Sequence, residues 1–493
     1  MIKICKFLLV FILIFSMILT YLPYVPQPVA DAVIYDARFG YLFGDVNNSS
    51  TIDATDALLI LQNSVNKIAF DEMQTLLGDV NKNGNIDASD ALLILQRSIG
   101  KIATFPAGDT YEKPEVSNPG GTQDVFKPVP SSEYLAYKEL TETQKSVYDI
   151  AYKKISERCT ESFSVGSARE VSLVDMMVGV RAVLCDHPEL FWAMTNFAYS
   201  TANYGNRIVH FFDGNSSTYL YKVENIPQMQ ATLEAKINQI FAETIKPSMS
   251  QPEIALALHN WLVENTTYDH AAVEDEVGHR TSWSAYAALI DGTAICEGLS
   301  KAYQLLLYRA GINCGLVTGP GHMWNYVSID GRWYQTDITW ADLDVPNSPL
   351  YLFYNQTSEI IAKSRNVDRN LSDISIDELT TIVNSRVISF NYNVPVATST
   401  RANWYIQNGL YFENDAQYLD QINEKIIENA LDGKKSIQVM IKDKYFVSGN
   451  EVDAYISQID WSGILWNLPS NLKFSSISRY YKNYGCGFII TWS

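Results

Sequence analysis

Cysteine, basic residues and long apolar segments are all scarce in this chain. It has only six cysteines in 493 residues, so a dense disulfide framework cannot hold the fold and hydrophobic cores must do so. Lys and Arg number 37 against 55 Asp and Glu, and the resulting net charge of −18 disfavours nucleic acid and anionic membranes as partners. Apolar residues still make up 47% of the chain, which is enough for several folded domains.

The N-terminal segment, residues 1–32, is typical of a secretory signal peptide. Lys3 and Lys6 flank the start of an apolar run, and Ala30 and Ala32 form an A-x-A site, so we expect cleavage after Ala32. The alternative is an uncleaved membrane anchor, but the apolar run falls short of the roughly 20 residues that span a bilayer. We therefore expect a secreted, extracellular protein with no membrane span after cleavage.

The cysteines that remain after this cleavage are odd in number. Export permits disulfides, and the mature chain keeps Cys159, Cys185, Cys296, Cys314 and Cys486. At least one of these thiols must therefore stay free or pair outside the chain.

Residues 44–68 and 78–102 are two copies of one pattern, a polar loop followed by an amphipathic helix. The copies are offset by 34 residues, and 17 of their 25 aligned positions are identical. In the first helix one apolar face holds Leu58, Leu61, Val65 and Ile68.

The two loops carry the oxygen donors that a hard cation requires. A 12-residue calcium loop supplies ligands from positions 1, 3, 5, 7, 9 and 12, with a sharp turn at position 6. Gly84 takes that turn in the second loop and Ser50 in the first, where a positive φ would cost about 1 kcal/mol. The predicted ligands are Asp45, Asn47, Ser49, the Thr51 carbonyl, Asp53 and Asp56, then Asp79, Asn81, Asn83, the Asn85 carbonyl, Asp87 and Asp90.

A simpler interpretation is that both loops are polar turns in which Asp begins a helix. Two loops in register with the same donor pattern favour calcium. The motifs "DVN", "IDA" and "LLILQ" in residues 40–104 resemble the type I dockerin module, although position 12 is Asp and no helix is expected before either loop.

The dockerin resemblance implies two structural calcium ions and docking onto a cohesin module of a scaffold protein. It also implies membership of a cellulosome-type assembly, in which polysaccharide breakdown is the shared process. Family members contact the cohesin near loop positions 10 and 11, which are here Ala54, Thr55, Ala88 and Ser89.

The rest of the chain divides by composition. Residues 105–131 carry five prolines and predict an extended linker. Residues 132–250 predict a mainly helical region with short strands at 207–212 and 218–223. Residues 251–365 hold the motifs that suggest chemistry, and residues 375–493 predict an α/β module without such a motif.

Cys296 opens a predicted helix that ends near Arg309, with Gly311 beyond it. Unpaired N–H groups at a helix start favour a thiolate, so Cys296 is a candidate nucleophile. The predicted buried stripe of this helix comprises Leu299, Ala302, Tyr303, Leu306 and Leu307. The simpler interpretation is that Cys296 is an inert buried side chain.

His322 and Asp337 are predicted to meet across a β-hairpin that turns at Asp330-Gly331. If those two residues form the turn, Asp337 lies opposite Trp324 and diagonal to His322, within the roughly 7–8 Å over which the two side chains can touch. Each residue alone could be a loop or capping residue. Together, Cys296, His322 and Asp337 offer the nucleophile, base and orienting carboxylate of acyl transfer, with the Cys296 N–H as an oxyanion donor.

The segments "CEGLSKAYQLLLYRAGI", "GHMWNYVSIDGRWYQTDITW" and "LHNWLVENTTYD" resemble the transglutaminase-like superfamily, a papain-related fold. The resemblance implies a Cys-His-Asp triad at the three residues above. It implies action on a peptide or protein substrate, by hydrolysis or by crosslinking, or a domain that has lost activity. It also suggests that Tyr286 lies near the site.

The expected protein is therefore a multidomain α+β chain: a small all-α dockerin, a transglutaminase-like α+β core with a helical N-terminal region, and a C-terminal α/β module. Calcium is the only cofactor that we expect. The alternative to an enzyme is a non-catalytic binding cargo of the scaffold with a vestigial triad. A glycoside hydrolase is disfavoured because no paired-carboxylate motif is found.

Overall fold

The computed structural model describes residues 41–492 except 48–51, 66, 69, 71, 109, 112–132, 194–196, 202–204, 211–218, 276–277, 342–350, 386–388, 433–436, 443, 445–448, 469–473 and 483–484. The predicted signal peptide, most of the predicted linker, and the predicted ligands Ser49 and Thr51 lie outside the described residues. Within the described part, no helix has both the length and the apolar character needed to cross a membrane.

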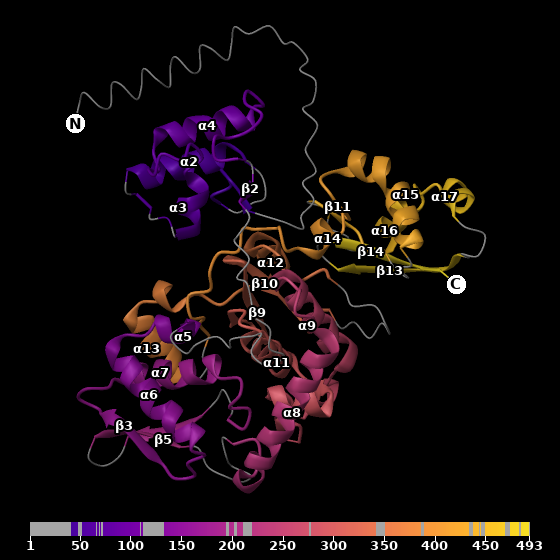
Figure 1. The fold of residues 1–493 in the computed structure, drawn as a ribbon. Helices are drawn as coiled ribbons and strands as arrows, with labels where there is room; N and C mark the ends of the chain where they lie inside the picture. The colour runs from indigo at the N-terminus through magenta and orange to yellow at the C-terminus, as the bar shows by residue number, and fades with distance from the viewer. Residues whose placement is uncertain are drawn as a thin grey trace, which may run out of the picture.

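The two repeats form one small unit, drawn in indigo in Figure 1. Its elements are β1 (Tyr41–Leu42), α2 (Ala54–Ser64), α3 (Glu72–Gly78), α4 (Ala88–Ser98) and β2 (Thr110–Tyr111). Asp53 and Asp87 begin α2 and α4, and each accepts a backbone N–H from the first turn of its helix. Ile60 and Ile94 are fully buried in the core between these helices, and β1 pairs with β2, which ties the ends of the unit together.

Two expectations for this unit are wrong. The predicted apolar face includes Leu58 and Val65, which are 52% and 62% exposed, whereas Ala57 and Ile60 are buried. Periodicity could not choose between two apolar faces of a helix so rich in leucine. In addition, α3 leads directly into the second loop, although the sequence predicts no helix before it.

Four helices dominate the next part of the chain: α5 (Leu135–Lys138), α6 (Glu142–Ser156), α7 (Leu173–Asp186) and α8 (Ile226–Thr244). They accompany an antiparallel sheet in the order β3 (Phe163–Ser167), β5 (Asn206–His210), β4 (Ala198–Thr201). β5 lies where a strand is predicted at 207–212, whereas β3 and β4 are not predicted. The strand predicted at 218–223 is wrong, because Tyr219 makes only an isolated bridge and Val223 begins a short 3-10 helix. α7 ends at Asp186, since Pro188 disfavours the helical conformation at His187.

The centre of the molecule is a three-stranded sheet packed against one helix. The elements here are α9 (Gln251–Asn265), β6 (Thr267–Tyr268), α10 (His270–Glu274), η3 (Arg280–Trp283), η4 (Ala287–Asp291), β7 (Thr293–Ala294), α11 (Cys296–Arg309), β8 (Cys314–Gly319), β9 (His322–Ile329), β10 (Arg332–Thr336) and α12 (Ser358–Ser364). The sheet order is β10-β9-β8, and α11 packs against β8 and β9. The predicted bounds of α11 are confirmed, but the helix is buried on nearly every side rather than along one stripe.

Alternation along β9 divides the sheet between two cores. Met323 and Val327 point into the core that contains α11. Trp324 and Tyr326, on the other face, join a second core formed largely by C-terminal residues such as Tyr405. The sheet is therefore covered on both faces, which explains why so many of its residues are apolar.

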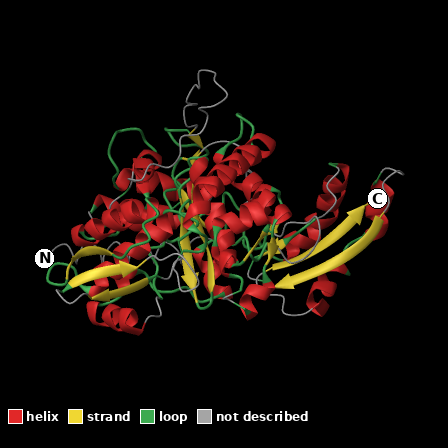
Figure 2. Ribbon diagram, turned by 90° about the horizontal axis from the view of Figure 1, so that it is seen from below, coloured by secondary structure: helices red, strands yellow, loops and turns green. Residues whose placement is uncertain are grey.

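The C-terminal part contains both helices and strands. Its elements are η5 (Leu371–Asp373), α13 (Ile376–Ser385), α14 (Trp404–Gln407), β11 (Tyr411–Phe412), α15 (Asp415–Leu431), β12 (Met440–Ile441), α16 (Gly449–Ile456), α17 (Trp461–Asn467), β13 (Phe474–Lys482) and β14 (Gly485–Trp492). β11 and β12 pair in parallel, and β13 and β14 form the long hairpin at the C-terminal end in Figure 2. α13 packs against α7 and so belongs spatially to the helical region.

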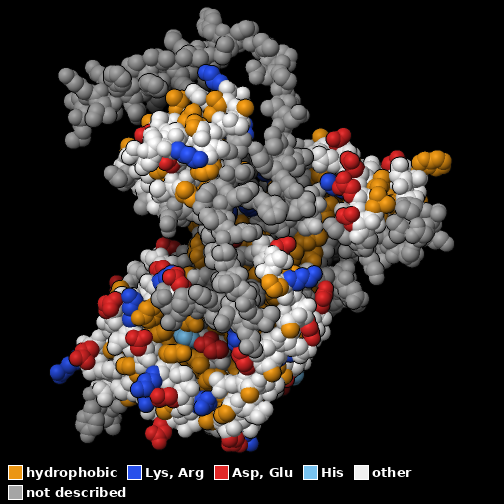
Figure 3. All heavy atoms as spheres, in the orientation of Figure 1, with side chains coloured by type: hydrophobic (Ala, Val, Ile, Leu, Met, Phe, Trp, Pro, Cys, Tyr) orange, Lys and Arg blue, Asp and Glu red, His pale blue; other side chains and the backbone are white. Residues whose placement is uncertain are grey.

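Figure 3 shows how charged and apolar side chains are distributed on one face of the molecule. On the face shown in Figure 3, acidic side chains are interspersed with basic ones rather than gathered in one patch. Apolar side chains are visible on the repeat unit in the same view, where Leu58, Val65, Leu92 and Ile99 are each more than half exposed.

Candidate active site

Cys296 is the first residue of α11, and two tight backbone contacts place it there. β7 pairs in parallel with β6 and brings Ala294 beside Tyr268. The Ile295 N–H donates to the Ser282 carbonyl at 3.0 Å, which draws the η3 segment onto the helix start. A Cβ at Gly298 would meet that same Ser282 carbonyl at 2.4 Å, so a glycine is required two residues after the cysteine. Cys296 is 8% exposed, and its thiol is free.

The hairpin beyond α11 has the predicted register. Asp330 and Gly331 both have positive φ, as a two-residue type I′ turn requires, and Ile329 pairs with Arg332. The sequence did not predict the third strand, β8, which pairs with β9 so that Gly319 lies opposite His322. This pairing fixes both sides of β9 and therefore the position at which His322 enters the site.

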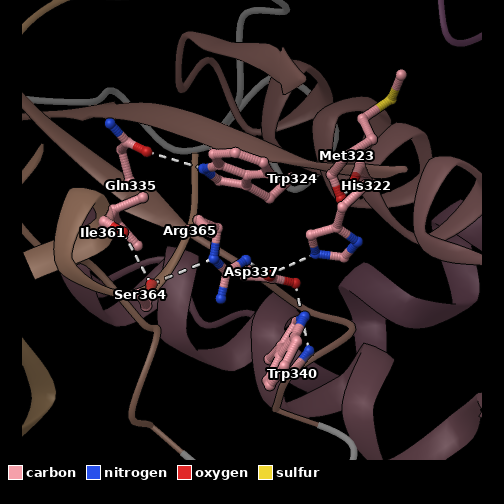
Figure 4. A network of polar contacts seen from close by, with 10 residues as sticks. His322, Met323, Trp324, Gln335, Asp337, Trp340, Ile361, Ser364 and Arg365 are labelled. Atoms are coloured by element: carbon pink, nitrogen blue, oxygen red, sulfur yellow. Dashed lines mark hydrogen bonds and ion pairs between the residues drawn. The ribbon is translucent and has the colours of Figure 1, made fainter. Parts of the chain in front are cut away.

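His322 and Asp337 meet as the register predicts. The His322 Nε2 lies 2.8 Å from the Asp337 Oδ2 (Figure 4). Asp337 is fully buried, and its backbone N–H donates to the Phe353 carbonyl at 2.9 Å. The His322 side chain is 19% exposed, so it reaches from the buried carboxylate toward the surface.

The Cys296 side chain also lies close to His322, near enough to raise the pKa of the imidazole. Burial lowers the pKa of His322, but the Asp337 carboxylate and the Cys296 thiol outweigh it and raise the pKa to about 9. Burial raises the pKa of Asp337, yet His322 and Arg365 together hold it below its ordinary value. The three predicted residues therefore form one connected series in which His322 is charged and Asp337 is ionised at neutral pH.

Two residues of this site were missed by sequence reasoning. The Arg365 guanidinium pairs with the Asp337 Oδ2, and the Trp340 N–H donates to the Oδ1 at 3.2 Å. Arg365 follows α12, far from the hairpin in sequence, and no sequence pattern links it to Asp337.

Tyr268 is the third missed residue. The Tyr268 hydroxyl lies close enough to the Cys296 backbone N–H for that group to lower the pKa of the phenol, so the phenol lies beside the predicted oxyanion donor. Burial and then the Cys296 thiol raise the pKa of Tyr268, so the phenol keeps its proton. Tyr286 does not take this place: its ring packs against Phe191 and Tyr221. Only the parallel pairing of β6 with β7 brings Tyr268 to the cysteine, and that pairing is not readable from the sequence.

The repeat loops show donor chemistry that fits calcium. Burial, followed by the charges of Asp45 and Asp53, raises the pKa of Asp56 to about 7, so this buried acidic group would gain from a cation. The pKa of Asp90 is raised as well, mainly by burial. Among the described residues, no group of three or more His, Cys, Asp or Glu side chains is placed to hold a metal ion. The predicted calcium ligands include asparagine side chains and backbone carbonyl oxygens besides carboxylates.

The second loop has the backbone that such a site requires. Gly84 has a φ of +83°, and its N–H and that of Asn83 both donate to the Asp79 carboxylate. Asp53 and Asp87 begin helices, as the simpler interpretation holds, and Asp56 and Asp90 accept backbone N–H groups from their own loops. The contacts are therefore compatible both with calcium-binding loops and with polar turns in which Asp begins a helix.

Comparison with known proteins matches two parts of the chain. Residues 43–98 match the family model described as the dockerin type I domain, and residues 238–338 match that of the transglutaminase-like superfamily. The second match begins inside α8 and contains Cys296, His322 and Asp337, whereas Arg365 lies beyond it.

Similar proteins were found among curated sequences and solved structures. The kyphoscoliosis peptidase of Mus musculus is 24% identical over 147 residues, and that of Homo sapiens is 23% identical over 145 residues; each alignment covers 26% of this chain. The chain spans only 22% of the length of these relatives. A crystal structure of a TGase is 18% identical, with a TM-score of 0.22, over 30% of this chain and 44% of its own.

A proposed cysteine protease from Cytophaga hutchinsonii is 13% identical, with a TM-score of 0.19, over 29% of this chain and 61% of its own. The two family matches agree in position with the repeat unit and with the central sheet and helix. The chain therefore contains a type I dockerin domain at residues 43–98 and a domain of the transglutaminase-like superfamily at residues 238–338.

Proposed function

We propose that this chain is a secreted cellulosome-type component whose transglutaminase-like domain carries out cysteine-dependent acyl transfer on peptide or amide bonds. The observation that supports this most is the grouping of the three residues: His322 is hydrogen-bonded to Asp337 at 2.8 Å, and the Cys296 side chain lies close enough to raise the pKa of His322. It places a nucleophile, a base and an orienting carboxylate in the order that acyl transfer requires.

In the first step Cys296 attacks the substrate carbonyl as a thiolate. His322 holds the thiol proton, because its raised pKa favours imidazolium at neutral pH. The new C–S bond forms as the carbonyl π electrons move onto oxygen. The Cys296 N–H and the Tyr268 hydroxyl lie together beside the thiol, so both can donate to that oxyanion.

The tetrahedral intermediate then collapses. His322 returns the proton to the leaving nitrogen as the C–N bond breaks, which leaves a thioester on Cys296. Water or a primary amine attacks the thioester and gives its proton to His322, and the thiolate leaves. Water completes hydrolysis, whereas an amine completes a crosslink.

Asp337 acts through the orientation of His322. It occupies the Nε2 side of the ring at 2.8 Å, so the Nδ1 side is the one left for Cys296. A carboxylate at Nε2 also stabilises the imidazolium that forms during both steps. Its own position is held by the backbone of Phe353 and Trp340.

The remaining parts of the chain serve delivery. A cleaved signal peptide at residues 1–32 would export the protein, and the dockerin would dock onto a cohesin module of a scaffold protein. Two calcium ions bound by the loops would hold them in shape for that contact, with Asp45, Asn47, Asp53 and Asp56 among the ligands of the first loop and Asp79, Asn81, Asn83, Asn85, Asp87 and Asp90 in the second. The acyl-transfer domain would then act within a polysaccharide-degrading assembly.

Acyl-enzyme trapping tests the proposal. The full chain is incubated with glutamine-containing peptides and a biotinylated amine, quenched in acid, and mapped by mass spectrometry for a thioester on Cys296. Cys296→Ala should lose the adduct, and Cys159→Ala, which removes a partly buried free thiol far along the chain, should keep it. If folded protein gives no adduct on Cys296 with any acyl donor, the domain is better described as a non-catalytic cargo of the scaffold.

A further inference from the structure

Arg365 shares one carboxylate oxygen with the base of the proposed site. Its guanidinium pairs with the Asp337 Oδ2, the same atom that the His322 Nε2 contacts at 2.8 Å (Figure 4). The backbone N–H of Trp340 donates to the Asp337 Oδ1. The Asp337 carboxylate is thus held by three donors, of which one carries a permanent positive charge.

The aromatic rings around His322 also enclose this guanidinium. The Arg365 Cζ lies 4.5 Å from the ring centroid of Phe353, 5.1 Å from that of Trp340 and 5.2 Å from that of Trp324. Trp324 stacks on His322 at 5.7 Å, and Trp340 meets it edge-on at 6.3 Å. The same two indoles therefore contact both the imidazole and the guanidinium, which favours a cation in this cage.

The backbone holds Arg365 at a fixed distance from the sheet. It ends α12, where its N–H donates to the Ile361 carbonyl at 3.0 Å and its Nε donates to the Ser364 hydroxyl at 3.3 Å. Its side chain is only 12% exposed. The packing around Arg365 therefore fixes its side-chain conformation, in contrast to the mobile, solvent-exposed side chains of a surface ion pair.

Two other titratable groups that face this pair, His259 and Tyr268, carry no charge near neutral pH. Burial lowers the pKa of His259, on α9, to about 4, so it is neutral. The raised pKa of Tyr268, on β6, keeps the phenol protonated. The Cys296 side chain, on α11, faces His322. Among the described groups that interact with Asp337, Arg365 is thus the one that carries a permanent positive charge.

We propose that Arg365 is a positioning residue that moderates the hold of Asp337 on His322, so that the imidazolium can release its proton to the leaving group. The proposal rests on the proposed function, because it concerns the same proton transfers. An aspartate facing His322 alone would hold the imidazolium too tightly for efficient general acid catalysis. The guanidinium draws part of that negative charge to itself and repels the imidazolium directly.

The test is an NMR titration of His322 in the full chain labelled with ¹³Cε1-histidine, with the His322 signal assigned from His322→Gln. Arg365→Gln keeps a planar donor among the rings and removes the charge, so the pKa of His322 should rise by about one pH unit. Arg365→Lys keeps the charge and should leave that pKa near the wild-type value. Arg369→Gln, which removes an exposed arginine paired with Glu378, is the matched control and should change nothing.

An unchanged His322 pKa in folded Arg365→Gln, or a fall, would overturn the proposal and leave Arg365 with a packing role only. If Arg365→Gln fails to fold, Arg365→Lys still decides: a shift of a full pH unit in that variant contradicts an effect of charge. The titration requires no turnover, so a chain without acyl-transfer activity can still give either result. Failure of the proposed function is therefore distinguishable from failure of this inference.

Discussion

Replacing Asp337 by asparagine should separate His322 from the charge that keeps it protonated. The pKa of His322 is about 9 in the fold, against an ordinary value of 6.5. This difference corresponds to about 3 kcal/mol in favour of the imidazolium. Asp337 is the first cause that raises this pKa and burial still lowers it, so the variant's value should fall well below that of the wild type. The imidazolium–thiolate pair should then be depleted, and alkylation of Cys296 at pH 7 should slow by about 10- to 100-fold.

The same substitution should change how stability depends on pH. A histidine whose pKa is raised on folding stabilises the fold fully below its unfolded pKa and loses that contribution as pH rises through its folded pKa. Wild-type stability should therefore fall by up to about 3 kcal/mol between pH 6.5 and pH 9 on account of His322. Asp337→Asn should remove this part of the slope. It should also cost about 3–5 kcal/mol below pH 6.5, because the enclosed Arg365 loses its carboxylate.

Two measurements check these effects. Iodoacetamide alkylation of Cys296 is followed by peptide mapping from pH 5 to pH 10, and urea unfolding is recorded over the same range. Asp377→Asn, at an exposed position in the first turn of α13, is the matched control and should behave as wild type. If folded Asp337→Asn alkylates Cys296 at the wild-type rate throughout, the carboxylate does not govern the thiol and the three residues do not act as a unit.

Tyr268→Phe should slow acylation by about 10²-fold or more, because it removes one oxyanion donor. The variant protein should unfold at nearly the same urea concentration as the wild type. Tyr286→Phe serves as its control in the same rate assay, and equal losses in both would contradict the placement. Ile60→Ala should destabilise the dockerin by about 2–5 kcal/mol and Leu58→Ala by under about 1 kcal/mol, since only the first side chain is buried. Thermal unfolding of the full chain would show the reverse order if the periodicity-based face were correct. Calorimetric titration with calcium should give two sites, and Asn83→Ala should weaken the tighter one; a single site that survives this change would contradict the ligand set.

Local features were predictable wherever a short stretch carries its own physical signal. The bounds of α11 follow from a helical run that ends before Gly311, and the structure reproduces them. The hairpin register follows from Asp330-Gly331, because two residues with positive φ allow only one pairing of the flanking strands. That register alone was enough to place His322 beside Asp337.

Features that depend on the choice between two similar surfaces were not predictable. The first dockerin helix has leucines on more than one face, and only packing against its repeat buries Ala57 and Ile60 in place of Leu58. The sequence likewise suggested Tyr286 as the tyrosine near the cysteine. A parallel pair of two-residue strands brings Tyr268 there instead.

The amino-acid sequence by itself determined the two repeated loops, the helix that begins at Cys296 and the hairpin with its histidine and aspartate, because each depends on neighbours within a few dozen residues. Only the tertiary structure decided what surrounds these groups. Arg365 reaches Asp337 because α12 packs beside β10, and Tyr268 reaches Cys296 because β6 pairs with β7. Such contacts join segments that are distant in the chain, and no sequence pattern indicates which of them will pack together. Many tertiary arrangements are compatible with the same local hydrophobic periodicity. The pKa of His322 is set by its burial together with Asp337 and Cys296, and that burial is decided by the tertiary structure.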